Sequence, residues 1–382
     1  MKEVHEKGNI LHLISSSGLL GAEHVLLELA EYSKKQGLKV TIGVFENSHN
    51  PNLELANSAK KLGLNVQMFP CSGRLDKKTV HIIKDYVDTE DVKILHSHNY
   101  KSNFYAWRAL SNNNVRWVVT NHGRRLGFKL LFYNLLDTVI ARRADKLIAV
   151  SDEIARKMKV AGINPEKVHV IKNGINLNRF IKNIGSNSIK ESLGIKKEIR
   201  VIGTIGSLTK EKGHVYLLKA ATNVIERFPE VMFLFVGDGK ERINLEKAAS
   251  KLGIEDKIIF SGMREDVPEI LSILDVFVLP SLNEGLPMAL LEAQAARIPA
   301  VATRVGAIPD VLEDGVTGIL VNSKDPEAIS EAIIRILEDH DSALSMAQKG
   351  FERVRDDFSS EKMASKYLSL YKELIEGTGC GA

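Results

Sequence analysis

Short apolar runs alternate with amphipathic stretches along the first half of the chain. The stretch at 22–37 places Val25, Leu26 and Leu29 on one face of a helix, and Gly37 follows as a helix-ending residue. Apolar runs suited to strands lie at 10–14, 39–45, 65–69, 92–98, 116–123, 146–151 and 167–174. Strands that alternate with helices predict βαβ units and a doubly wound parallel sheet.

A polar stretch rich in Asn, Ser and Gly interrupts this pattern, and we expect an inter-domain linker near 178–197. A second series of apolar runs follows at 200–206, 231–239, 257–263, 275–281, 298–306 and 317–322. The second series predicts another open α/β sheet, and a length of 382 residues also favours two domains. We expect the following division: an N-terminal domain over 1–180, a C-terminal domain over 181–356, and a helix over 357–376 that packs back on the N-terminal domain.

Composition excludes several classes of protein. With 44% hydrophobic residues the chain is not mainly disordered, and two cysteines exclude a disulfide scaffold and a zinc site of four cysteines. No apolar run reaches the ~18–20 residues that a membrane-spanning helix needs. The N-terminus lacks the apolar core and cleavage site of a signal peptide. We therefore expect a cytoplasmic protein with reduced thiols.

Charge is distributed unevenly between the two halves. Residues 1–180 hold 27 basic and 17 acidic residues, whereas residues 181–382 hold 25 basic and 31 acidic residues. The first half therefore has a net charge of +10 and the second half −6. A basic half suits an anionic partner, which at this point is a nucleic acid, a membrane surface or a phosphorylated substrate.

The segment at 280–299 is the richest in candidate chemistry. A polar turn with Glu284 follows a predicted strand, and Pro287 suits the first turn of a helix. The amides of Gly285, Leu286 and Met288 would then point out of the helix N-terminus and form an anion site. Glu284, and Glu292 eight positions later, can accept hydrogen bonds from vicinal hydroxyls of a sugar or ribose. An ordinary loop acid and a solvated helix acid would fit the same spacing.

This segment, with the letters E-G-L-P-M-A-L-L-E, resembles the E-x7-E signature of the retaining glycosyltransferases of family 4. Six further landmarks occur in that family's order along nearly the whole chain: the glycine loop at 18–23, H-S-H at 96–98, T-N-H-G at 120–123, A-D-K-L-I-A-V-S at 144–151, V-I-K-N-G-I at 170–175, and Lys212-Gly213. The resemblance implies an α/β protein of the GT-B fold, with two Rossmann-like doubly wound domains that face a deep cleft. Ligands of such sheets bind at the carboxyl ends of the strands.

The resemblance also implies a binding site for the sugar donor. Gly21, with Gly18, would offer backbone amides to the donor diphosphate, and Lys212 would bind its charge. Glu292 would accept the ribose hydroxyls, and Glu284 would hold those of the sugar. The residues expected to border the base are Gly262, Met263 and Arg264. The catalytic residues implied are His122, which touches the transferred sugar, Lys212 and Glu284.

The acceptor side is expected in the first domain, at Gly18, His96, His98, Asn99 and Arg124. An H-x-H pair on one strand face also suggests a metal, but nothing nearby in the sequence completes a ligand set. We expect polar lining of an acceptor pocket instead, no bound metal and no required cofactor. Gly237-Asp238-Gly239 does not continue to the third glycine of a dinucleotide-binding loop, which argues against a nicotinamide cofactor.

One position departs from the family pattern. The phosphate loop of the family reads G-R-L-x-x-x-K-G, and this chain has Ser207 in place of the arginine. A serine hydroxyl replaces only part of the charge-assisted bonds of a guanidinium, each worth roughly 1.5–3 kcal/mol. Lys210 would reach the diphosphate, or Lys212 would act alone. Donor affinity is therefore in question, whereas the fold is not.

The stretch at 121–146 is mostly apolar between two arginine pairs, Arg124-Arg125 and Arg142-Arg143. This pattern suits an interfacial helix on anionic lipid, and equally a core helix with basic ends. The absence of a recognised motif and an aromatic content of 6% argue against nucleic acid.

The sequence thus predicts a retaining glycosyltransferase that moves a sugar from a UDP- or GDP-type donor to a hydroxyl acceptor. Polysaccharide or lipid-linked glycan assembly is the setting that the resemblance implies. The stretch at 121–146 is compatible with a cytoplasmic protein that is peripheral on the inner face of the cell membrane. The alternatives are a sugar-nucleotide epimerase or a phosphorylase on the same scaffold, a non-catalytic sugar-nucleotide binder, and a membrane-surface interaction protein.

Overall fold

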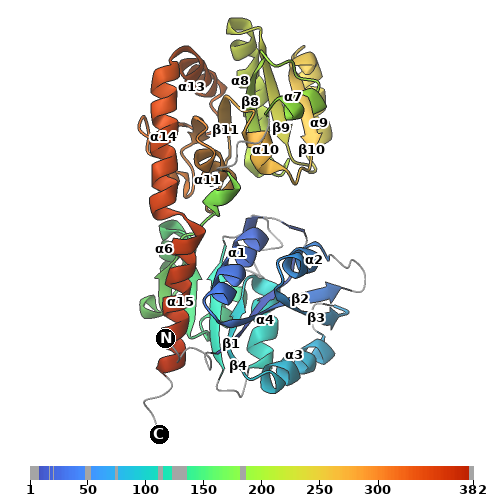
Figure 1. Cartoon of the computed structure of the whole chain (residues 1–382), viewed down its shortest axis with the longest axis vertical. Coiled ribbons are helices and arrows are strands. Elements are labelled where there is room, and N and C mark those ends of the chain that lie inside the picture. Colours follow the sequence, from blue (N-terminus) through green and yellow to red (C-terminus); the bar gives the residue numbers. More distant parts are fainter. Residues whose placement is uncertain are drawn as a thin grey trace. The chain divides into compact units, whose positions relative to one another are not determined.

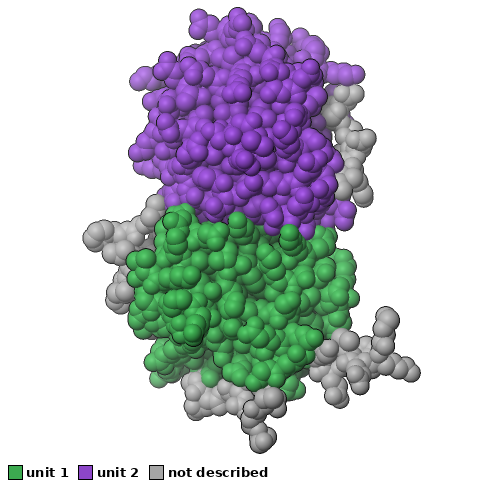
Figure 2. All heavy atoms as spheres, turned by 90° about the vertical axis from the view of Figure 1, so that its left-hand side faces the viewer, with its two compact units in different colours: residues 1–174, 360–382 green, residues 175–359 purple. Residues whose placement is uncertain are grey.

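A computed structural model of the chain divides into two compact units (Figures 1 and 2). Unit 1 comprises residues 1–174 and 360–382, and unit 2 comprises residues 175–359. The boundaries lie a few residues from those expected at 180 and 356. The structure describes residues 8–16, 18–19, 21–47, 53–73, 76–110, 115–122, 136–180 and 186–377.

Unit 1 is built on a parallel sheet with the strand order β3-β2-β1-β4-β5-β6-β7. Its strands are β1 (Asn9–Ile14), β2 (Lys39–Asn47), β3 (Asn65–Cys71), β4 (Val92–Ser97), β5 (Arg116–Asn121), β6 (Lys146–Ala149) and β7 (Val168–Val170). Its helices are α1 (Gly21–Lys35), α2 (Glu54–Lys61), α3 (Lys77–Thr89), α4 (Tyr100–Ala109), α6 (Asp152–Val160) and α15 (Ser360–Glu376). Every residue of β1 is buried, as in a parallel sheet with both faces covered.

The last helix of the chain belongs to unit 1. Met363, Tyr367, Leu370 and Tyr371 recur at helical spacing along α15 and are buried. This stripe brings α15 into contact with α1 and β4, so that the C-terminal helix covers strands formed early in the chain (Figure 1).

Unit 2 repeats the architecture with the strand order β10-β9-β8-β11-β12-β13, again all parallel. Its strands are β8 (Arg200–Ile205), β9 (Val231–Val236), β10 (Ile258–Gly262), β11 (Val276–Leu279), β12 (Ala300–Thr303) and β13 (Ile319–Val321). Its α-helices are α7 (Ser186–Ser192), α8 (His214–Arg227), α9 (Arg242–Lys251), α10 (Val267–Leu271), α11 (Met288–Ala295), α12 (Ile308–Val311), α13 (Pro326–Glu338) and α14 (His340–Asp357). The prediction of two doubly wound parallel-sheet domains is confirmed.

The core of unit 2 lies between the sheet and the amphipathic helices α8 and α13. Phe233 and Phe235 of β9 and Leu217 of α8 are completely buried there, together with Ile333 of α13. The register of β8 with β9 pairs Ile202 with Phe233, so large apolar side chains of neighbouring strands meet in one layer.

Some expected boundaries are wrong. The stretch at 178–197, expected as a linker, contains α7, and Ile195 just after it is buried. The expected strand at 167–174 is regular only over Val168–Val170. Among the described residues, no helix combines the length and the apolar character needed to cross a bilayer.

Candidate functional site

The strand order of unit 2 brings the predicted donor-binding loops together. β8 and β11 are neighbours, whereas β9 lies on the far side of β8 and β12 on the far side of β11. The chain therefore leaves these two strands in opposite directions, and such a switch point opens a crevice at the carboxyl ends of the strands. Lys212 follows β8 and Glu284 follows β11, so both residues lie at this point.

Lys212 and Glu284 form a direct ion pair. The Nζ atom of Lys212 lies 2.6 Å from Oε1 of Glu284, and the Ser281 hydroxyl donates to the same oxygen at 2.7 Å. The side chain of Glu284 is only 8% exposed, whereas that of Lys212 is 26% exposed. The carboxylate is thus fixed in the loop by two partners, and the lysine side chain is the more exposed member of the pair.

Two glycines allow the loops around this pair to approach closely. Gly213 (φ +64°) lies against the Pro280 carbonyl and Gly306 (φ +55°) against the Glu284 carbonyl. A Cβ atom would come within 2.1 Å and 2.0 Å of these oxygens, so no other residue fits without a shift of the backbone. The Leu282 amide also donates to the Glu211 carbonyl at 2.7 Å, which joins the two loops directly.

The helix after the Glu284 loop is α11, and Pro287 is its N-cap rather than its first residue as predicted. The Leu290 and Leu291 amides donate to the Pro287 carbonyl at 3.1 and 3.2 Å, whereas the Met288 and Ala289 amides before them have no carbonyl one turn earlier in the helix to accept them. Glu292 lies one turn further along and is half-buried. Burial raises the pKa of Glu292 to about 7, and the positive charge of Arg179 opposes the rise. This carboxyl group is therefore divided between its two protonation states near neutral pH.

Ser207 lies beside the Lys212 loop and is exposed. The next residue, Leu208, is completely buried, and its amide donates to the Asp238 carbonyl at 2.9 Å. The loop is thereby anchored on one side while Ser207 faces outward, so the side chain at position 207 is free to vary in size.

The residues expected to border the base lie at the end of β10. The Gly237 amide donates to the Gly262 carbonyl at 2.8 Å, and Met263 is 70% exposed. The guanidinium of Arg264 is held by Asp266 through hydrogen bonds of 2.8 and 2.5 Å. A ligand that used Arg264 would therefore compete with Asp266.

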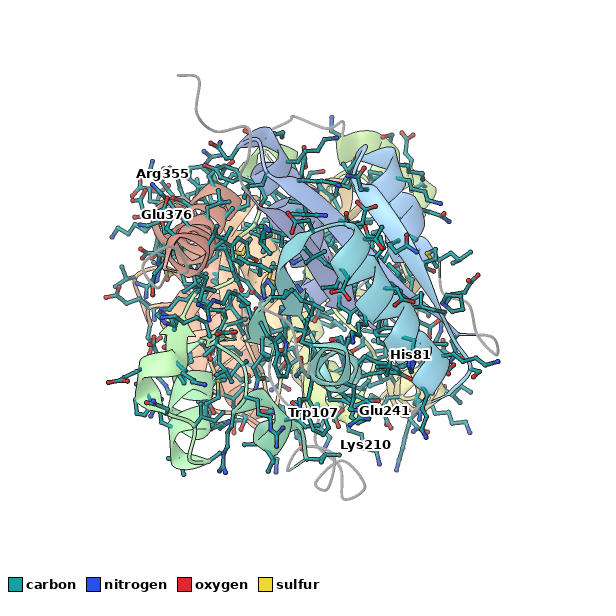
Figure 3. All side chains as sticks on the ribbon, turned by 90° about the horizontal axis from the view of Figure 1, so that it is seen from below. His81, Trp107, Lys210, Glu241, Arg355 and Glu376 are labelled. Atoms are coloured by element: carbon teal, nitrogen blue, oxygen red, sulfur yellow. The ribbon has the colours of Figure 1, made fainter. Side chains whose placement is uncertain are left out.

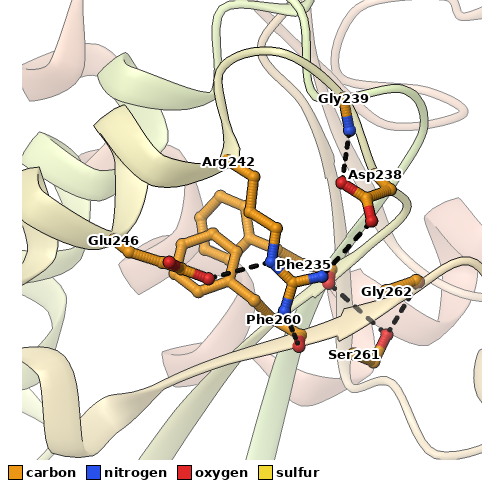
Figure 4. Close-up of polar contacts among 8 residues, drawn as sticks. All are labelled: Phe235, Asp238, Gly239, Arg242, Glu246, Phe260, Ser261 and Gly262. Carbon is orange, nitrogen blue, oxygen red and sulfur yellow. Dashed lines mark hydrogen bonds and ion pairs between the residues drawn. The ribbon is translucent and has the colours of Figure 1, made fainter.

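A second arginine supports this edge of the sheet (Figure 4). Arg242 lies between Glu246 at 2.9 Å and Asp238 at 3.5 Å, and also donates to the Phe260 carbonyl at 3.4 Å. The residue joins the start of α9 to the ends of β9 and β10, which gives the neighbouring loop a rigid base.

Unit 1 has its own switch point, between β1 and β4. In the register of these two strands, His12 is paired with His96. His98 lies two residues beyond His96, and His122 follows β5, the next strand. Four histidines consequently meet at one end of the sheet, and His96 and His98 lie with their ring centroids 4.1 Å apart.

Hydrogen bonds connect these histidines to each other and to α15. Nδ1 of His12 lies 3.0 Å from Nε2 of His98, and Nε2 of His122 lies 3.5 Å from Nδ1 of His98. His96 contacts the Tyr371 hydroxyl through Nδ1 at 2.6 Å and the Thr120 hydroxyl through Nε2 at 2.7 Å.

The histidine cluster is neutral at ordinary pH. Burial lowers the pKa of His12 to about 3 and that of His122 to about 4. Burial, and then repulsion by neighbouring histidines, holds the pKa values of His96 and His98 well below the usual range. Burial likewise raises the pKa of Tyr371, so its hydroxyl keeps its proton.

The cluster also has the geometry of a metal site. The ring nitrogens of His12, His96 and His98 lie within 4.8 Å of one another. Neutral imidazoles are suitable ligands. However, both nitrogens of His96 are occupied by hydroxyl groups, so an ion would have to displace one of these hydrogen bonds.

The expected acceptor-side residues differ in position. The His96 side chain is fully buried and both of its nitrogens are hydrogen-bonded to hydroxyl groups. Asn99 is the N-cap of α4 and also donates to the Ser15 carbonyl at 2.9 Å. The Gly18 amide donates to the Ser16 hydroxyl, and Gly21 opens α1. Arg124 lies outside the described residues.

Sequence reasoning missed the partners that hold the predicted residues. Ser281 precedes the signature by three residues, and His12 is a lone histidine inside an apolar run. Tyr371 comes from the last helix, 275 positions after its partner His96. The position of His12 inside an apolar strand was the only feature of the local sequence that could have pointed to one of these partners. Ser281 and Tyr371 could not be found in this way, because their contacts depend on the tertiary structure.

Two family models match the sequence. The model described as glycosyltransferase family 4 matches residues 20–179, and the model described as glycosyl transferases group 1 matches residues 186–353. The first match lies mainly on unit 1 and the second lies within unit 2.

Named relatives and solved structures cover most of the chain. A UDP-Gal:alpha-D-GlcNAc-diphosphoundecaprenol alpha-1,3-galactosyltransferase of Escherichia coli is 27% identical, over 98% of this chain and 99% of the relative. A D-inositol 3-phosphate glycosyltransferase of Corynebacterium urealyticum is 30% identical, over 74% of this chain and 71% of the relative. The structure of Anabaena HepE in complex with UDP and glucose has a TM-score of 0.86 at 20% identity, over 96% of this chain and 100% of that one. This last likeness shows the same fold.

Proposed function

Since this chain belongs to the group 1 glycosyltransferases and has their GT-B fold, we propose that it is a retaining enzyme that takes its sugar from a UDP-sugar. The observation that carries this proposal is the Lys212–Glu284 ion pair of 2.6 Å at the switch point of unit 2. A fixed carboxylate beside a more exposed lysine suits a molecule with sugar hydroxyls on one side and a diphosphate on the other.

In this proposal each group of the site has one task. Lys212 and the first amides of α11 bind the diphosphate and stabilise the negative charge that grows on it as the sugar leaves. Glu284 accepts hydrogen bonds from the sugar hydroxyls and orients the ring. Glu292 accepts hydrogen bonds from the ribose hydroxyls, which favours its ionised form.

The proposed reaction keeps the configuration of the sugar. The bond from the anomeric carbon to the diphosphate oxygen breaks, and a bond to the acceptor oxygen forms on the same face of the ring. The acceptor proton passes to the departing phosphate. Lys212 and the amides supply positive charge at that oxygen, so we propose that transfer requires no divalent metal.

The relatives support a choice of donor and acceptor. The galactosyltransferase named above acts, by its name, with UDP-Gal on a diphosphoundecaprenol-linked sugar. For this chain we likewise propose UDP as the nucleotide and a lipid-linked glycan as the acceptor. In the described part of 121–146, Leu136 and Val139 are exposed and Arg142 and Arg143 carry charge beside them, a surface suited to anionic lipid.

The first experiment measures the melting temperature of the protein with UDP, GDP, ADP and dTDP in turn. We expect UDP to raise it most, because a ligand that binds only the folded state stabilises that state. UDP-sugars that bind are then offered with lipid-linked acceptors in the presence of a metal chelator, and the anomeric configuration of the product is determined by NMR. Glu284→Gln should retain UDP binding and lose transfer.

Three results would contradict the proposal. They are a product with inverted anomeric configuration, loss of activity when the metal chelator is added, and a melting temperature that none of the four nucleotides changes.

Ser207 favours one second candidate function, a sugar-nucleotide binder without transferase activity. That candidate predicts UDP-sugar binding with no product from any acceptor in a broad panel, and Ser207→Arg would leave it inactive.

A further inference from the structure

A completely buried serine of unit 2 supports the carboxylate of Glu284. Ser281 lies two residues beyond the end of β11 and is 0% exposed. Its hydroxyl donates to Oε1 of Glu284 at 2.7 Å, and among the described residues this hydroxyl has no other acceptor. Because no part of Ser281 is exposed, a ligand cannot touch it. Any influence of Ser281 on a ligand must therefore pass through Glu284.

The backbone around Ser281 is fixed by the neighbouring strand. Thr303, the last residue of β12, is also completely buried. Its hydroxyl donates to the Ser281 carbonyl at 2.6 Å and lies 3.4 Å from the Leu279 carbonyl. The chain is thus held on both sides of Pro280, whose own carbonyl lies against Gly213. The Ser281 hydroxyl consequently starts from a fixed point of the fold.

The two carboxylate oxygens of Glu284 are used unequally. Oε1 accepts hydrogen bonds from Ser281 at 2.7 Å and from Lys212 at 2.6 Å, which occupies both of its lone pairs. Oε2 has no hydrogen bond to any residue that the structure describes, and it is not one of the solvent-inaccessible polar atoms without a partner. Oε2 therefore keeps accessible surface, and it is the oxygen that the hydroxyls of a ligand would meet.

The two donors to Oε1 differ in the other partners open to them. The side chain of Lys212 is 26% exposed, and the proposed function also assigns the diphosphate to it. Ser281 is buried and keeps Glu284 as its acceptor whether or not a ligand is bound.

We propose that Ser281 is a positioning residue that fixes the Glu284 carboxylate through Oε1, so that Oε2 remains the acceptor for the hydroxyls of the donor sugar. This inference rests on the proposed function, because that function places the sugar hydroxyls against Glu284. An acceptor that is already in place needs no ordering of its side chain when the ligand binds. The benefit falls on the sugar part of the donor, since the nucleotide does not touch Glu284 in this proposal.

The first test compares the affinities for UDP and for UDP-sugars in the absence of an acceptor. Isothermal titration calorimetry with UDP, UDP-Gal and UDP-glucose measures all three. Ser281→Ala should weaken the binding of the tighter UDP-sugar about three- to tenfold, the worth of one hydrogen bond, and leave the affinity for UDP unchanged. A purely structural role predicts equal losses for UDP and for the UDP-sugar. Equal losses would overturn the inference, and so would unchanged binding of the UDP-sugar.

A double-variant cycle tests whether the effect passes through Glu284. In Glu284→Ala the carboxylate is absent, so the further change Ser281→Ala should have no effect on the affinity for the UDP-sugar. An additional loss in the double variant would show that Ser281 acts by another route. Ser281→Cys keeps the side chain close to its size but donates weakly, and should therefore behave like Ser281→Ala. Wild-type affinity for the UDP-sugar in Ser281→Cys would show that only the filled volume matters.

Two matched controls separate position from burial. Ser330 on α13 is 2% exposed, and its hydroxyl donates to the Glu327 carbonyl at 2.8 Å. Ser330→Ala thus deletes a buried hydroxyl away from the Glu284 loop, and should lower the melting temperature without changing the ratio of the affinities for UDP-sugar and UDP. Arg355→Gln changes an exposed residue on α14 and is the surface control (Figure 3).

Crystal structures of two variants test the anchor without any ligand. In Lys212→Ala we expect Oε1 of Glu284 to stay on the Ser281 hydroxyl, because this donor alone is sufficient to hold it. In the double variant Lys212→Ala/Ser281→Ala we expect Glu284 to adopt a different rotamer. A Glu284 side chain that leaves Ser281 in Lys212→Ala would overturn the inference.

The inference and the proposed function fail separately. A wild type that binds none of the three nucleotides would contradict the proposed function, while the ligand-free structures would still show whether Ser281 holds Glu284. A wild type that binds the UDP-sugar more tightly than UDP, with the same ratio in Ser281→Ala, would refute this inference and leave the proposed function intact.

Discussion

Lys212 and Glu284 meet at 2.6 Å although 72 positions separate them in the chain. They meet because β8 and β11 are adjacent in the sheet, so the loops after these two strands begin side by side. Close contacts at Gly213 and Gly306 then hold the loops together. The ion pair therefore depends on the order of the strands and on the close approach of the two loop backbones.

Lys212→Ala should lower kcat at least about tenfold, because it removes positive charge that faces the departing diphosphate. It should also destabilise the fold, since the carboxylate of Glu284, only 8% exposed, would retain Ser281 but lose its counter-charge. The double variant with Glu284→Gln should be more stable than Lys212→Ala alone. Chemical denaturation measures the stabilities, and Lys219→Ala is the exposed control on α8. Wild-type turnover in Lys212→Ala would contradict the role assigned to the lysine.

Ser207→Arg should tighten the binding of UDP about tenfold, which corresponds to one additional charge-assisted hydrogen bond. Ser207 is exposed, so a longer side chain finds room without displacing the buried Leu208 next to it. Isothermal titration calorimetry with UDP measures the effect, and Ser207→Ala is the matched control. If Ser207→Arg binds UDP no better than Ser207→Ala does, the diphosphate lies elsewhere.

The affinity for UDP should rise between pH 6 and pH 8. Burial raises the pKa of Glu292 to about 7, so its carboxyl group loses its proton across this interval and becomes a better acceptor for ribose hydroxyls. Glu292→Gln should show a flatter dependence on pH. UDP itself titrates identically in the measurements on the wild type and on Glu292→Gln. The difference between their two curves of UDP affinity against pH is therefore due to Glu292. Parallel curves would exclude contact between this carboxylate and the nucleotide.

The same raised pKa predicts a cost in stability. Between the ordinary pKa of glutamate, near 4.3, and about 7, the folded state holds a proton that the unfolded state has released. The free energy of unfolding therefore falls as pH rises through this window. Glu292→Gln should be more stable than the wild type at pH 8 and gain little at pH 4.5. Urea denaturation at both pH values measures this, with Glu226→Gln as the exposed control.

The histidine cluster predicts the opposite response to pH in unit 1. In the unfolded chain these histidines bind protons below about pH 6.5, whereas burial lowers the pKa of His122 to about 4 and of His12 to about 3. The stability is thus complete above pH 6.5 and is lost as pH falls, by up to about 1.4 kcal/mol per pH unit for each such histidine.

Tryptophan fluorescence can follow this loss, because Trp107 and Trp117 are the only two tryptophans and both belong to unit 1. Urea midpoints between pH 7 and pH 4.5 should fall steeply in the wild type and less steeply in His12→Asn. Equal slopes would show that His12 accepts a proton in the folded state.

Local sequence patterns were sufficient to predict the two parallel sheets and the position of the two glutamates at the start of a helix. Apolar runs that alternate with amphipathic stretches indicated two parallel sheets, because burial on both faces imposes that pattern on each strand separately. The glutamate signature placed Glu284 just before a helix and Glu292 within it. This was possible because residues a few positions apart in one segment have fixed relative positions once that segment forms a helix. The helix α7 was missed, because polar residues dominate it and only tertiary contacts bury its neighbour Ile195.

What the sequence by itself determined is therefore which residues stand at the ends of strands and at the starts of helices. Only the tertiary structure decided which of these residues meet. The order of β8 and β11 joined Lys212 to Glu284, and the register of β1 with β4 placed His12 beside His96. The return of α15 brought Tyr371 onto His96 from 275 positions away. Such contacts depend on the packing of whole elements, whose energy is spread over many buried side chains and leaves no local signal in the sequence.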